Sequence, residues 1–491
     1  MRKHPPRCLS LLLFATVAGC ASMGNNSPTP LPRDANTLDA GRDIAQARSD
    51  DAAWPTATWW QTFGDPQLDA LVTGAIAGNP GLAAAQARIA QAQAAASGAR
   101  AATLPSAQAS AAFTYTRFSE QQFFPPPYAG NFYWNSDAQI DLGYDLDLWG
   151  RNRSALAAAL DGVQISACEA QAVRLALEGA VVRAYAGLSY QYALDQNFKA
   201  ILRDQQLTRD IAQRRLAAGI GTDLDVQQAQ TAIASTQAQL EQVDAQMQIL
   251  RHQLAALAGN GPGSGDDLTP PALHFSQAAA LPRSIPAQLV GLRPDLVAQR
   301  WRVERAARDI DVAKTAFYPD INLAAVAGVL SLNFSKLLSG SAAQAGIGPA
   351  ISLPLFDGGR LRANLQSRRA EYDGAVADYD ATLVAALEDV ADHISALRSL
   401  ALQSQQRNAA LASAQRAHTL ALKAFRAGLT DYLNVLSAQS ALNTQRGLVA
   451  EIQFRQLLAA AGLNQALGGG LMVRSDEHAP TAPAPDHADE Q

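Results

Sequence analysis

The chain switches between two patterns of hydrophobic and polar positions. In its middle part, apolar residues recur every seven positions at Val226, Ile233, Leu240, Met247 and Leu254, with Val243, Leu250 and Leu257 on a companion seam. A seven-residue repeat is typical of helices packed as coiled coils. Proline interrupts an α-helix, and none occurs between Pro127 and Pro262 or between Pro354 and Pro480. The pattern therefore predicts continuous helices at about 151–217, 223–258, 360–427 and 431–467, the first roughly 100 Å long.

Between the helices the period changes to two. From Ala138 to Leu148 the even positions are apolar or aromatic, whereas the odd positions include Gln139 and Asp141. This alternation is typical of a strand with lipid on one face and water on the other, and equally of a soluble sheet with one buried face. We expect a partner strand at about 110–118 and a weaker pair at 320–330 and 344–355.

Three landmarks occur twice, in the same order and about 210 residues apart, so the chain is an internal duplication. The repeated landmarks are 79–82 with 293–296, 146–153 with 353–360, and 216–230 with 425–439. The sequence predicts a signal peptide at 1–19, a lipidated segment at 20–64, a first repeat at 65–258, a flexible linker at 259–285, a second repeat at 286–467 and a disordered tail at 468–491.

The N-terminus has the pattern of an export signal, with three basic residues before a short apolar run. Val17 to Cys20 resembles the lipobox of bacterial lipoproteins, which predicts acylation of Cys20, and Ala21 favours sorting to the outer membrane. An ordinary cleaved signal with an incidental cysteine is the alternative. After cleavage Cys168 would have no cysteine partner within the chain, so no internal disulfide is expected.

Composition argues against several function classes. The net charge is -5 and the basic residues are scattered, which argues against binding to nucleic acid. The histidines are isolated from other metal ligands, and the loop Gly259–Asp267 lacks the lysine of a phosphate-binding loop. We therefore expect no catalytic residues, no metal site and no cofactor.

Four strands of about ten residues can cross a membrane but cannot close a barrel. An open sheet would expose unpaired backbone groups to hydrocarbon, so closure must come from other copies of the chain. Two copies give eight strands and three give twelve, and the charged inward face favours three. A lipid-anchored coiled-coil scaffold and a cell-wall enzyme on a helical stalk are the alternatives to a channel.

Four motifs carry a family resemblance: Tyr144–Arg151, Leu292–Leu296, Leu353–Arg360 and the Ala427–Gly428 turn. With the opening at Trp59, they resemble the TolC-type outer-membrane efflux proteins and, more closely, their lipid-anchored NodT-like branch. The resemblance implies an α+β membrane protein that forms a homotrimer, with a twelve-stranded transmembrane β-barrel continuous with a long α-helical barrel in the periplasm of a Gram-negative bacterium. It also implies a passive exit duct for small toxic compounds, with a periplasmic adaptor protein and an inner-membrane pump as partners. Nothing in the sequence indicates the substrate or the class of pump.

The landmark at 216–230 and 425–439 predicts two helix-to-helix turns. Gly219 and Gly428 are expected in the left-handed conformation, with Thr222 or Asp223 and Thr430 or Asp431 capping the returning helices. By resemblance, these turns form the periplasmic tips. The adaptor-docking residues are then Ala218, Gly219, Ala427, Gly428, Leu429 and Thr430.

The resemblance also assigns a gate to the first turns of the last long helix. Many relatives carry a carboxylate ring there, whereas this chain has Asn434 and Ser437, and Leu433 matches an apolar constriction residue. We therefore expect a neutral gate of Leu433, Asn434 and Ser437. Charges near the tips are expected either to latch neighbouring helices together or to be solvated surface charges; these are Asp223, Asp225, Arg426 and Asp431.

Overall fold

A computed structural model describes residues 30–39, 41–47, 54–121, 125–273 and 292–470. The predicted signal peptide, Cys20, the second part of the linker and nearly all of the predicted tail lie outside these residues. The chain divides into two compact units: unit 1 from Met1–Pro32, Arg88–Ser166 and Ala298–Tyr379, and unit 2 from Arg33–Ala87, Ala167–Val297 and Asp380–Gln491. Each unit takes parts of both predicted repeats, and the repeat boundaries themselves stay a prediction.

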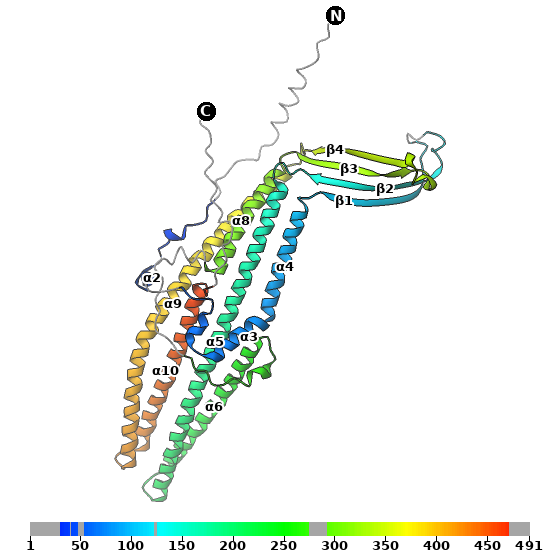
Figure 1. The fold of residues 1–491 in the computed structure, drawn as a ribbon. Helices are drawn as coiled ribbons and strands as arrows, with labels where there is room; N and C mark the ends of the chain where they lie inside the picture. Colours follow the sequence, from blue (N-terminus) through cyan, green and yellow to red (C-terminus); the bar gives the residue numbers. More distant parts are fainter. Residues whose placement is uncertain (1–29, 40, 48–53, 122–124, 274–291, 471–491) are drawn as a thin grey trace, which may run out of the picture. The chain divides into compact units, whose positions relative to one another are not determined.

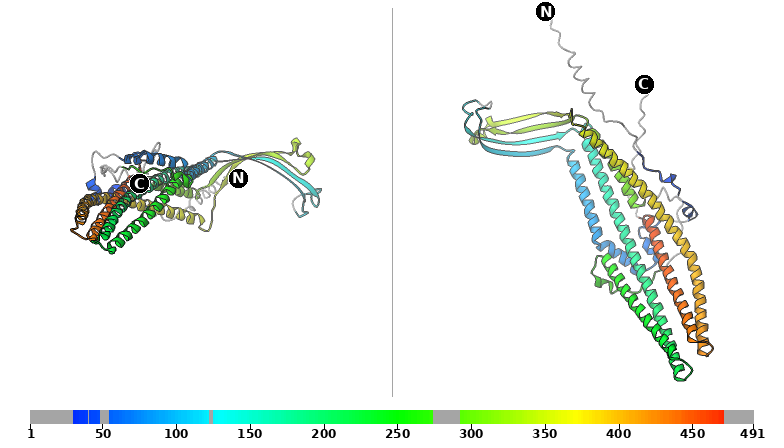
Figure 2. Two further views of the ribbon diagram at one scale, coloured as in Figure 1. Left: turned by 90° about the horizontal axis from the view of Figure 1, so that it is seen from below. Right: turned by 180° about the vertical axis from the view of Figure 1, so that it is seen from behind.

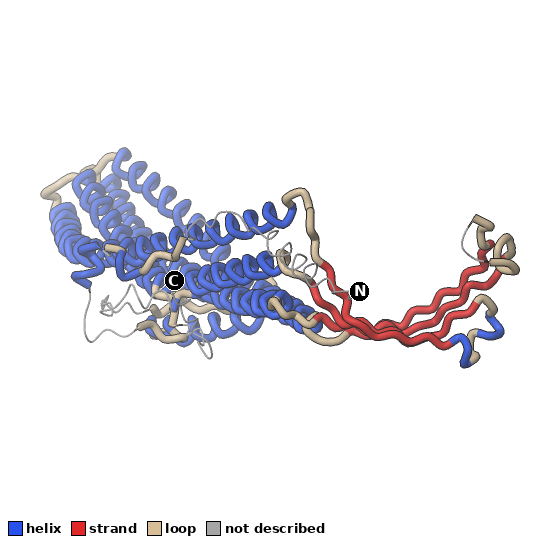
Figure 3. Tube along the Cα trace, turned by 90° about the horizontal axis from the view of Figure 1, so that it is seen from above, coloured by secondary structure: helices blue, strands red, loops and turns tan. Residues whose placement is uncertain are grey.

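Unit 1 contains one antiparallel sheet of four strands in the order β1-β2-β3-β4. The strands are β1 (Ser106–Arg117), β2 (Phe132–Asp145), β3 (Asp320–Ser331) and β4 (Ala343–Ser352). They lie side by side in Figure 3. Two 3-10 helices, η4 (Phe334–Lys336) and η5 (Gly340–Ala342), form the connection between β3 and β4. Within the described chain, β1 and β4 each have one edge without a partner strand.

The strand register separates an apolar from a polar face of this sheet. Ala109 pairs with Ile140, which in turn pairs with Ala327 on the next strand, so these three share a face. Gln108 and Asp141 pair on the opposite face. Ile140 and Ile347 are 52% and 78% exposed, so large apolar side chains of the sheet lie open in the single chain.

The predicted strands were found, but their ends differ. β2 stops at Asp145 rather than Leu148, because Asp147 has a positive φ of 44° and its N–H donates to Asp145 Oδ1 at 2.9 Å. β4 stops at Ser352 rather than Leu355, two residues before Pro354, and contains Pro349, which is tolerated because β4 has one edge without a partner strand in the described chain. β1 starts at Ser106 and β2 at Phe132, so both begin earlier than expected.

The motif Tyr144–Arg151 forms the corner where β2 ends and helix α5 begins. The Arg151 guanidinium forms ion pairs with Asp145 and with Asp320 of β3, the latter at 3.2 Å. The Trp149 indole N–H donates to the Pro319 carbonyl at 2.7 Å and the ring stacks on Tyr318. These contacts join the two predicted repeats at this corner.

Four long helices appear in two pairs of equal length (Figure 1). α5 (Arg151–Ala217) and α9 (Arg360–Arg426) have 67 residues each, and α6 (Asp223–Leu257) and α10 (Tyr432–Ala466) have 35 each. These bounds confirm the predicted helices to within about two residues. In Figure 2, α6 returns beside α5 and α10 beside α9. No helix in the described residues is long and apolar enough to cross a membrane.

The turns of both hairpins have the predicted conformation. Gly219 and Gly428 have φ of 73° and 78°, values that a side chain would disfavour. In each turn two backbone bonds close the last helical turn, from Gly219 and Ile220 in one and from Gly428 and Leu429 in the other. The returning helices are capped by Thr222, which forms a capping box with Asp225, and by Asp431, which accepts from the Asn434 N–H.

Shorter elements of unit 2 pack on the long helices. η2 (Trp59–Phe63) and α3 (Pro66–Gly78) contribute buried residues to the main core, which also contains Val181, Tyr185, Leu254 and Ala461. The buried Tyr185 hydroxyl donates to Asp65 Oδ2 at 2.8 Å. A second core places Ile44 of α2 (Gly41–Ala47) with residues of α9 and α10. Of the heptad positions, Ile233, Val243, Met247 and Leu254 are buried, as expected.

The remaining described elements are η1 (Ala35–Thr37), α4 (Pro80–Ala101), η3 (Pro262–Gly265) and α8 (Pro294–Thr315). The described part of the predicted flexible linker is held in place. Ala272 N–H donates to Asp65 Oδ2 at 2.7 Å, and Thr269 bonds the Gln67 side chain. These long-range partners could not be inferred from a Gly-rich stretch.

Candidate functional site

The tips of the two hairpins meet in unit 2 through a small apolar cluster. Phe425, Tyr432 and Val435 of the second hairpin are buried with Ala229 of the first. Tyr432 lies on the first turn of α10, and Phe425 on the last turn of α9. We call this group the tip contact. It joins residues from both copies of the repeated landmark.

Arg215 on α5 adds a polar link across the tip contact. Its Nη1 donates to the Phe425 carbonyl at 3.2 Å, and its guanidinium lies 4.9 Å from the centre of the Phe425 ring. A second, longer bond of 3.5 Å runs from Nη2 to the Ile220 carbonyl. Because Arg215 belongs to the first hairpin and Phe425 to the second, moving the tips apart breaks the bond and the ring contact with Phe425, whereas the bond to Ile220 lies within the first hairpin. The sequence reasoning missed Arg215, although its place beside the predicted turn could have singled it out.

Tyr432 is 1% exposed, and burial together with the nearby Asp225 raises the pKa of its hydroxyl above its ordinary value. Its hydroxyl has no hydrogen-bond partner among the described residues. A buried hydroxyl without a partner is costly, so this position is a weak point of the tip contact.

The predicted docking residues form the outer surface of the two turns. Ala218, Gly219, Ala427, Gly428 and Leu429 are exposed, and Thr430 is half-buried and accepts a bond from Asn434 Nδ2 at 2.8 Å. Beside them lie apolar side chains that the sequence analysis did not select, Ile220 and Leu224, which are 69% and 64% exposed. The turns therefore present an apolar surface that water covers in the single chain.

The predicted gate residues lie on one exposed side of the first turns of α10. Leu433, Asn434 and Ser437 are exposed, whereas Tyr432 and Val435, on the other side of the same turns, are buried in the tip contact. Asn434 is held by bonds to Thr430 Oγ1 and Asp431 Oδ1 at 2.8 and 3.0 Å. The three side chains thus share a face, and their role as a gate stays a prediction.

The predicted latch residues make local contacts in the single chain. Asp225 and Asp431 cap the returning helices, and Asp223 accepts a long bond of 3.5 Å from Gln227. Arg426 is exposed and forms no ion pair within the part of the chain that the structure describes. A latch to a neighbouring helix stays a prediction, whereas the link inside the chain comes from Arg215.

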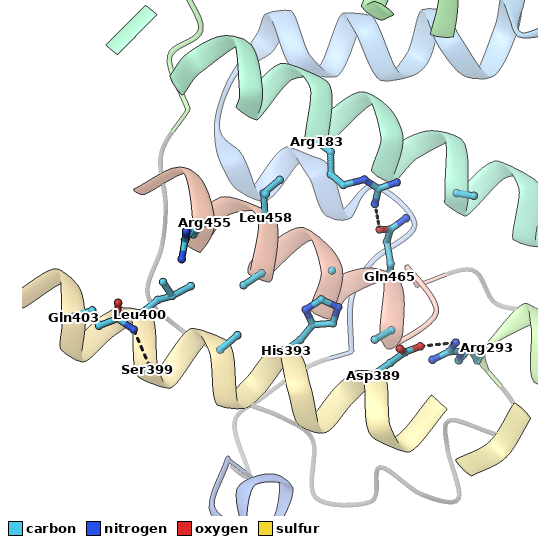
Figure 4. A pocket seen from close by; sticks show the side chains of 15 residues that line it. Arg183, Arg293, Asp389, His393, Ser399, Leu400, Gln403, Arg455, Leu458 and Gln465 are labelled. Carbon is cyan, nitrogen blue, oxygen red and sulfur yellow. Dashed lines mark hydrogen bonds and ion pairs between the residues drawn. The ribbon is translucent and has the colours of Figure 1, made fainter. Parts of the chain in front are cut away.

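A second site is a cavity of about 820 Å³ in unit 2, between α5, α9 and α10. Figure 4 shows Arg183 reaching from α5 to Gln465 of α10, and His393 pointing from α9 toward α10. Leu400 and Leu458 line the same space, with Arg455 beside them, and Arg293 and Asp389 lie at the other end. The sequence analysis included Arg293 in the motif Leu292–Leu296, treated the histidines as isolated from other metal ligands, and did not select the other lining residues.

No arrangement in the described residues resembles an active site. The same residues contain no group of three His, Cys, Asp or Glu side chains that could share a metal ion. Cys168 is buried, and burial raises the pKa of its thiol to about 11, so it is a poor nucleophile. The two sites are therefore suited to binding and to conformational change.

Comparisons with a family model, with known sequences and with solved structures all find proteins of the outer membrane, of efflux or of resistance as similar to this chain. The model of the family described as outer membrane efflux protein matches residues 71–260 and 285–469. The fusaric acid resistance protein FusA of Burkholderia cepacia is 43% identical over 363 residues, which cover 73% of this chain and 68% of that protein. The putative multidrug resistance outer membrane protein MdtQ of Escherichia coli K12 is 32% identical and covers 94% of this chain and 97% of its own. Among solved structures, the outer membrane protein VceC of Vibrio cholerae matches with a TM-score of 0.80 and 33% identity, over 85% of this chain and 100% of that chain.

Proposed function

Because the chain belongs to the outer membrane efflux protein family, we propose that three copies of it form the exit duct of a tripartite pump, closed at the hairpin tips and opened by a periplasmic adaptor. The chain itself is an outer-membrane efflux channel with an α+β channel fold, and it is not an enzyme. The proposal adds the number of copies, the gate, the partners and the lipid anchor.

The open sheet is the observation that carries the proposal. In hydrocarbon each unpaired backbone group costs several kcal/mol, and the outer edges of β1 and β4 have no partner strand in the described chain. Pairing β4 of one copy with β1 of the next removes these edges. Three copies give a barrel of about twelve strands, wide enough for water, whereas two would give one that is filled by side chains. The polar face of the sheet, with Gln108 and Asp141, would then line the pore.

The tips supply the closed end. In a trimer the exposed side of α10 with Leu433, Asn434 and Ser437 would face the axis and form a neutral constriction. The exposed apolar turn residues Ile220, Leu224 and Leu429 would receive the adaptor, because they lose unfavourable contact with water when covered. Displacing the tip contact would then open the gate.

The anchor and the substrates complete the proposal. Acylation of Cys20 would hold each copy on the outer membrane with two or more acyl chains, enough for stable anchoring. Since relatives are named for resistance to several drugs and to fusaric acid, we propose small toxic compounds as the solutes, delivered by an inner-membrane pump.

Purification of the full-length protein in detergent tests the proposal. Light scattering should give a trimer, and planar bilayers should show ion-conducting channels that multivalent cations added on the periplasmic side do not strongly block. A monomer without conductance would refute the duct, and strong block would refute the neutral gate. Replacement of Cys20 by serine, C20S, should remove the acyl chains but leave the protein in the membrane after a carbonate wash, because the barrel remains. Release by the wash would instead indicate a lipid-anchored scaffold.

A further inference from the structure

A group of buried polar residues lies one heptad beyond the tip contact in unit 2. Seven residues advance a helix by about 10 Å and return to the same face. We count from one residue of each long helix at the tips: Arg215, Ala229, Phe425 and Tyr432. Seven positions farther from the turns, each of the four helices carries a polar residue that is at most 6% exposed: Thr208, Thr236, His418 and Gln439. We call these four residues the polar layer.

Apolar residues lie on both sides of the polar layer. The tip contact is on one side, and on the other, seven residues farther along α5 and α6, Ile201 and Val243 are buried. The side-chain amide of Gln439 has no hydrogen-bond partner on either its oxygen or its nitrogen among the described residues. A buried polar group without a partner costs free energy that contact with water recovers. Separating the hairpins therefore costs less at the polar layer than at the apolar residues beside it.

His418 of α9 is the titratable member of the polar layer. Burial lowers the pKa of its imidazole below the ordinary value of 6.5, so the ring is neutral at pH 7 while the tips are together. The charged groups that act on it are Asp204 of α5, which favours the protonated form, and Arg446 of α10, which opposes it. The residue that α6 contributes to the layer, Thr236, is uncharged. Protonation would thus place a cation in a buried layer of otherwise neutral side chains.

We propose that the polar layer is a pH-sensitive element of the gate, in which protonation of His418 separates the two hairpins and favours the open channel. Water reaches the imidazole once the hairpins part, so the separated state binds the proton more tightly than the closed state. The closed state is therefore favoured at neutral pH and loses stability as the pH falls. The inference rests on the proposed function, because it needs a gate at the tips.

The size of the effect has an upper limit. At pH 5.5 a fully solvated imidazole with the ordinary pKa of 6.5 is protonated about ten times more often than it is neutral. If the ring stays neutral in the closed state, protonation shifts the equilibrium toward separated hairpins by about ten-fold in each copy, and by less if the closed state also takes up the proton.

Single-channel recordings of the full-length protein in planar bilayers at pH 7.5 and pH 5.5 test the inference. The open probability of the wild type should rise at least about three-fold at the lower pH. H418Q keeps a polar side chain that cannot be protonated, and its rise should be at least about three-fold smaller than that of the wild type. The matched control is H252Q, which removes an exposed histidine of α6 and should respond to pH as the wild type does.

A second variant, Q439L, tests the polar layer at a single pH. Leucine removes the amide without a partner and stabilises the closed state, so the open probability at pH 5.5 should fall about five-fold or more below that of the wild type. Its control is Q453L, which replaces an exposed glutamine of the same helix and should leave the open probability unchanged.

Equal open probabilities of the wild type at both pH values would overturn the inference, and so would a rise of equal size in H418Q. An open probability of Q439L equal to that of the wild type would also overturn it, because the layer would then stay buried when the channel opens. Each of these results from a conducting trimer refutes only the pH-sensitive element. A monomer without conductance refutes the proposed function, and this inference with it.

Discussion

Replacement of Arg215 by methionine, R215M, is expected to destabilise the closed state of the channel. Methionine keeps an apolar stem of similar length but loses the bond to the Phe425 carbonyl and the contact with the Phe425 ring. A charged hydrogen bond contributes about 1.5 kcal/mol at the low end of its range, which suits a half-buried side chain, and a cation–π contact adds about 0.5 kcal/mol. The sum of about 2 kcal/mol corresponds to a roughly 30-fold shift toward separated tips in each copy.

Single-channel recordings in planar bilayers measure this shift as the open probability without an adaptor. The matched control is R214M, which removes the same charge from the preceding residue, because the exposed Arg214 bonds only a carbonyl of its own helix. R215M should open at least about ten-fold more often than R214M. If both variants open equally often and both form trimers, the tip contact does not hold the gate closed and the reasoning fails.

Three further variants test the structure elsewhere. Burial raises the pKa of Asp161 to about 6, so its ionisation opposes folding: stability is greatest below the unfolded pKa of 3.8 and is lost as the pH rises through about 6. D161N should therefore raise the free energy of unfolding at pH 7.5 by about 1 kcal/mol, after allowance for partial exposure of the side chain, and raise the melting temperature with it. At pH 3.5 the variant should have no such effect. An equal gain at both pH values would contradict this explanation. G462A should lower the free energy of unfolding by about 1–3 kcal/mol, because the added methyl group overlaps the His393 ring. The control G447A, on the same helix with open space around it, should be neutral or stabilising. Equal melting temperatures of the two variants would show that the His393 ring moves aside freely. Y185F removes the donor to the buried Asp65 and should cost about 1–2 kcal/mol, and an unchanged unfolding midpoint would mean that water replaces the hydroxyl.

The elements that local chemistry determines could be predicted from the sequence. The ends of the long helices follow from prolines, from Gly219 and Gly428, and from the capping residues Thr222 and Asp431, all within a few positions of the end itself. The strands follow from alternation, which needs no knowledge of their partners. Their ends were less accurate, because Asp147 adopts a left-handed conformation that is uncommon for a residue with a side chain.

The contacts that make the sites could not be predicted in the same way. Arg215 bonds a carbonyl 210 positions away, and Arg183 bonds an amide 282 positions away. Such pairs depend on which helix faces line up after packing, and Ala-rich and Gln-rich helices offer many alternative alignments. The resemblance selected the exposed turns but not the buried residues that hold them together.

The equal lengths of the two hairpins limit how the molecule can change in size. Because Arg215 of one hairpin bonds the turn of the other, removing residues from one hairpin alone would pull its tip away from that partner. Removing seven residues from each arm shortens a hairpin by about 10 Å while keeping the same faces buried. A longer or shorter duct, suited to a different distance between the membranes, therefore requires insertions or deletions of equal length in both halves of the gene.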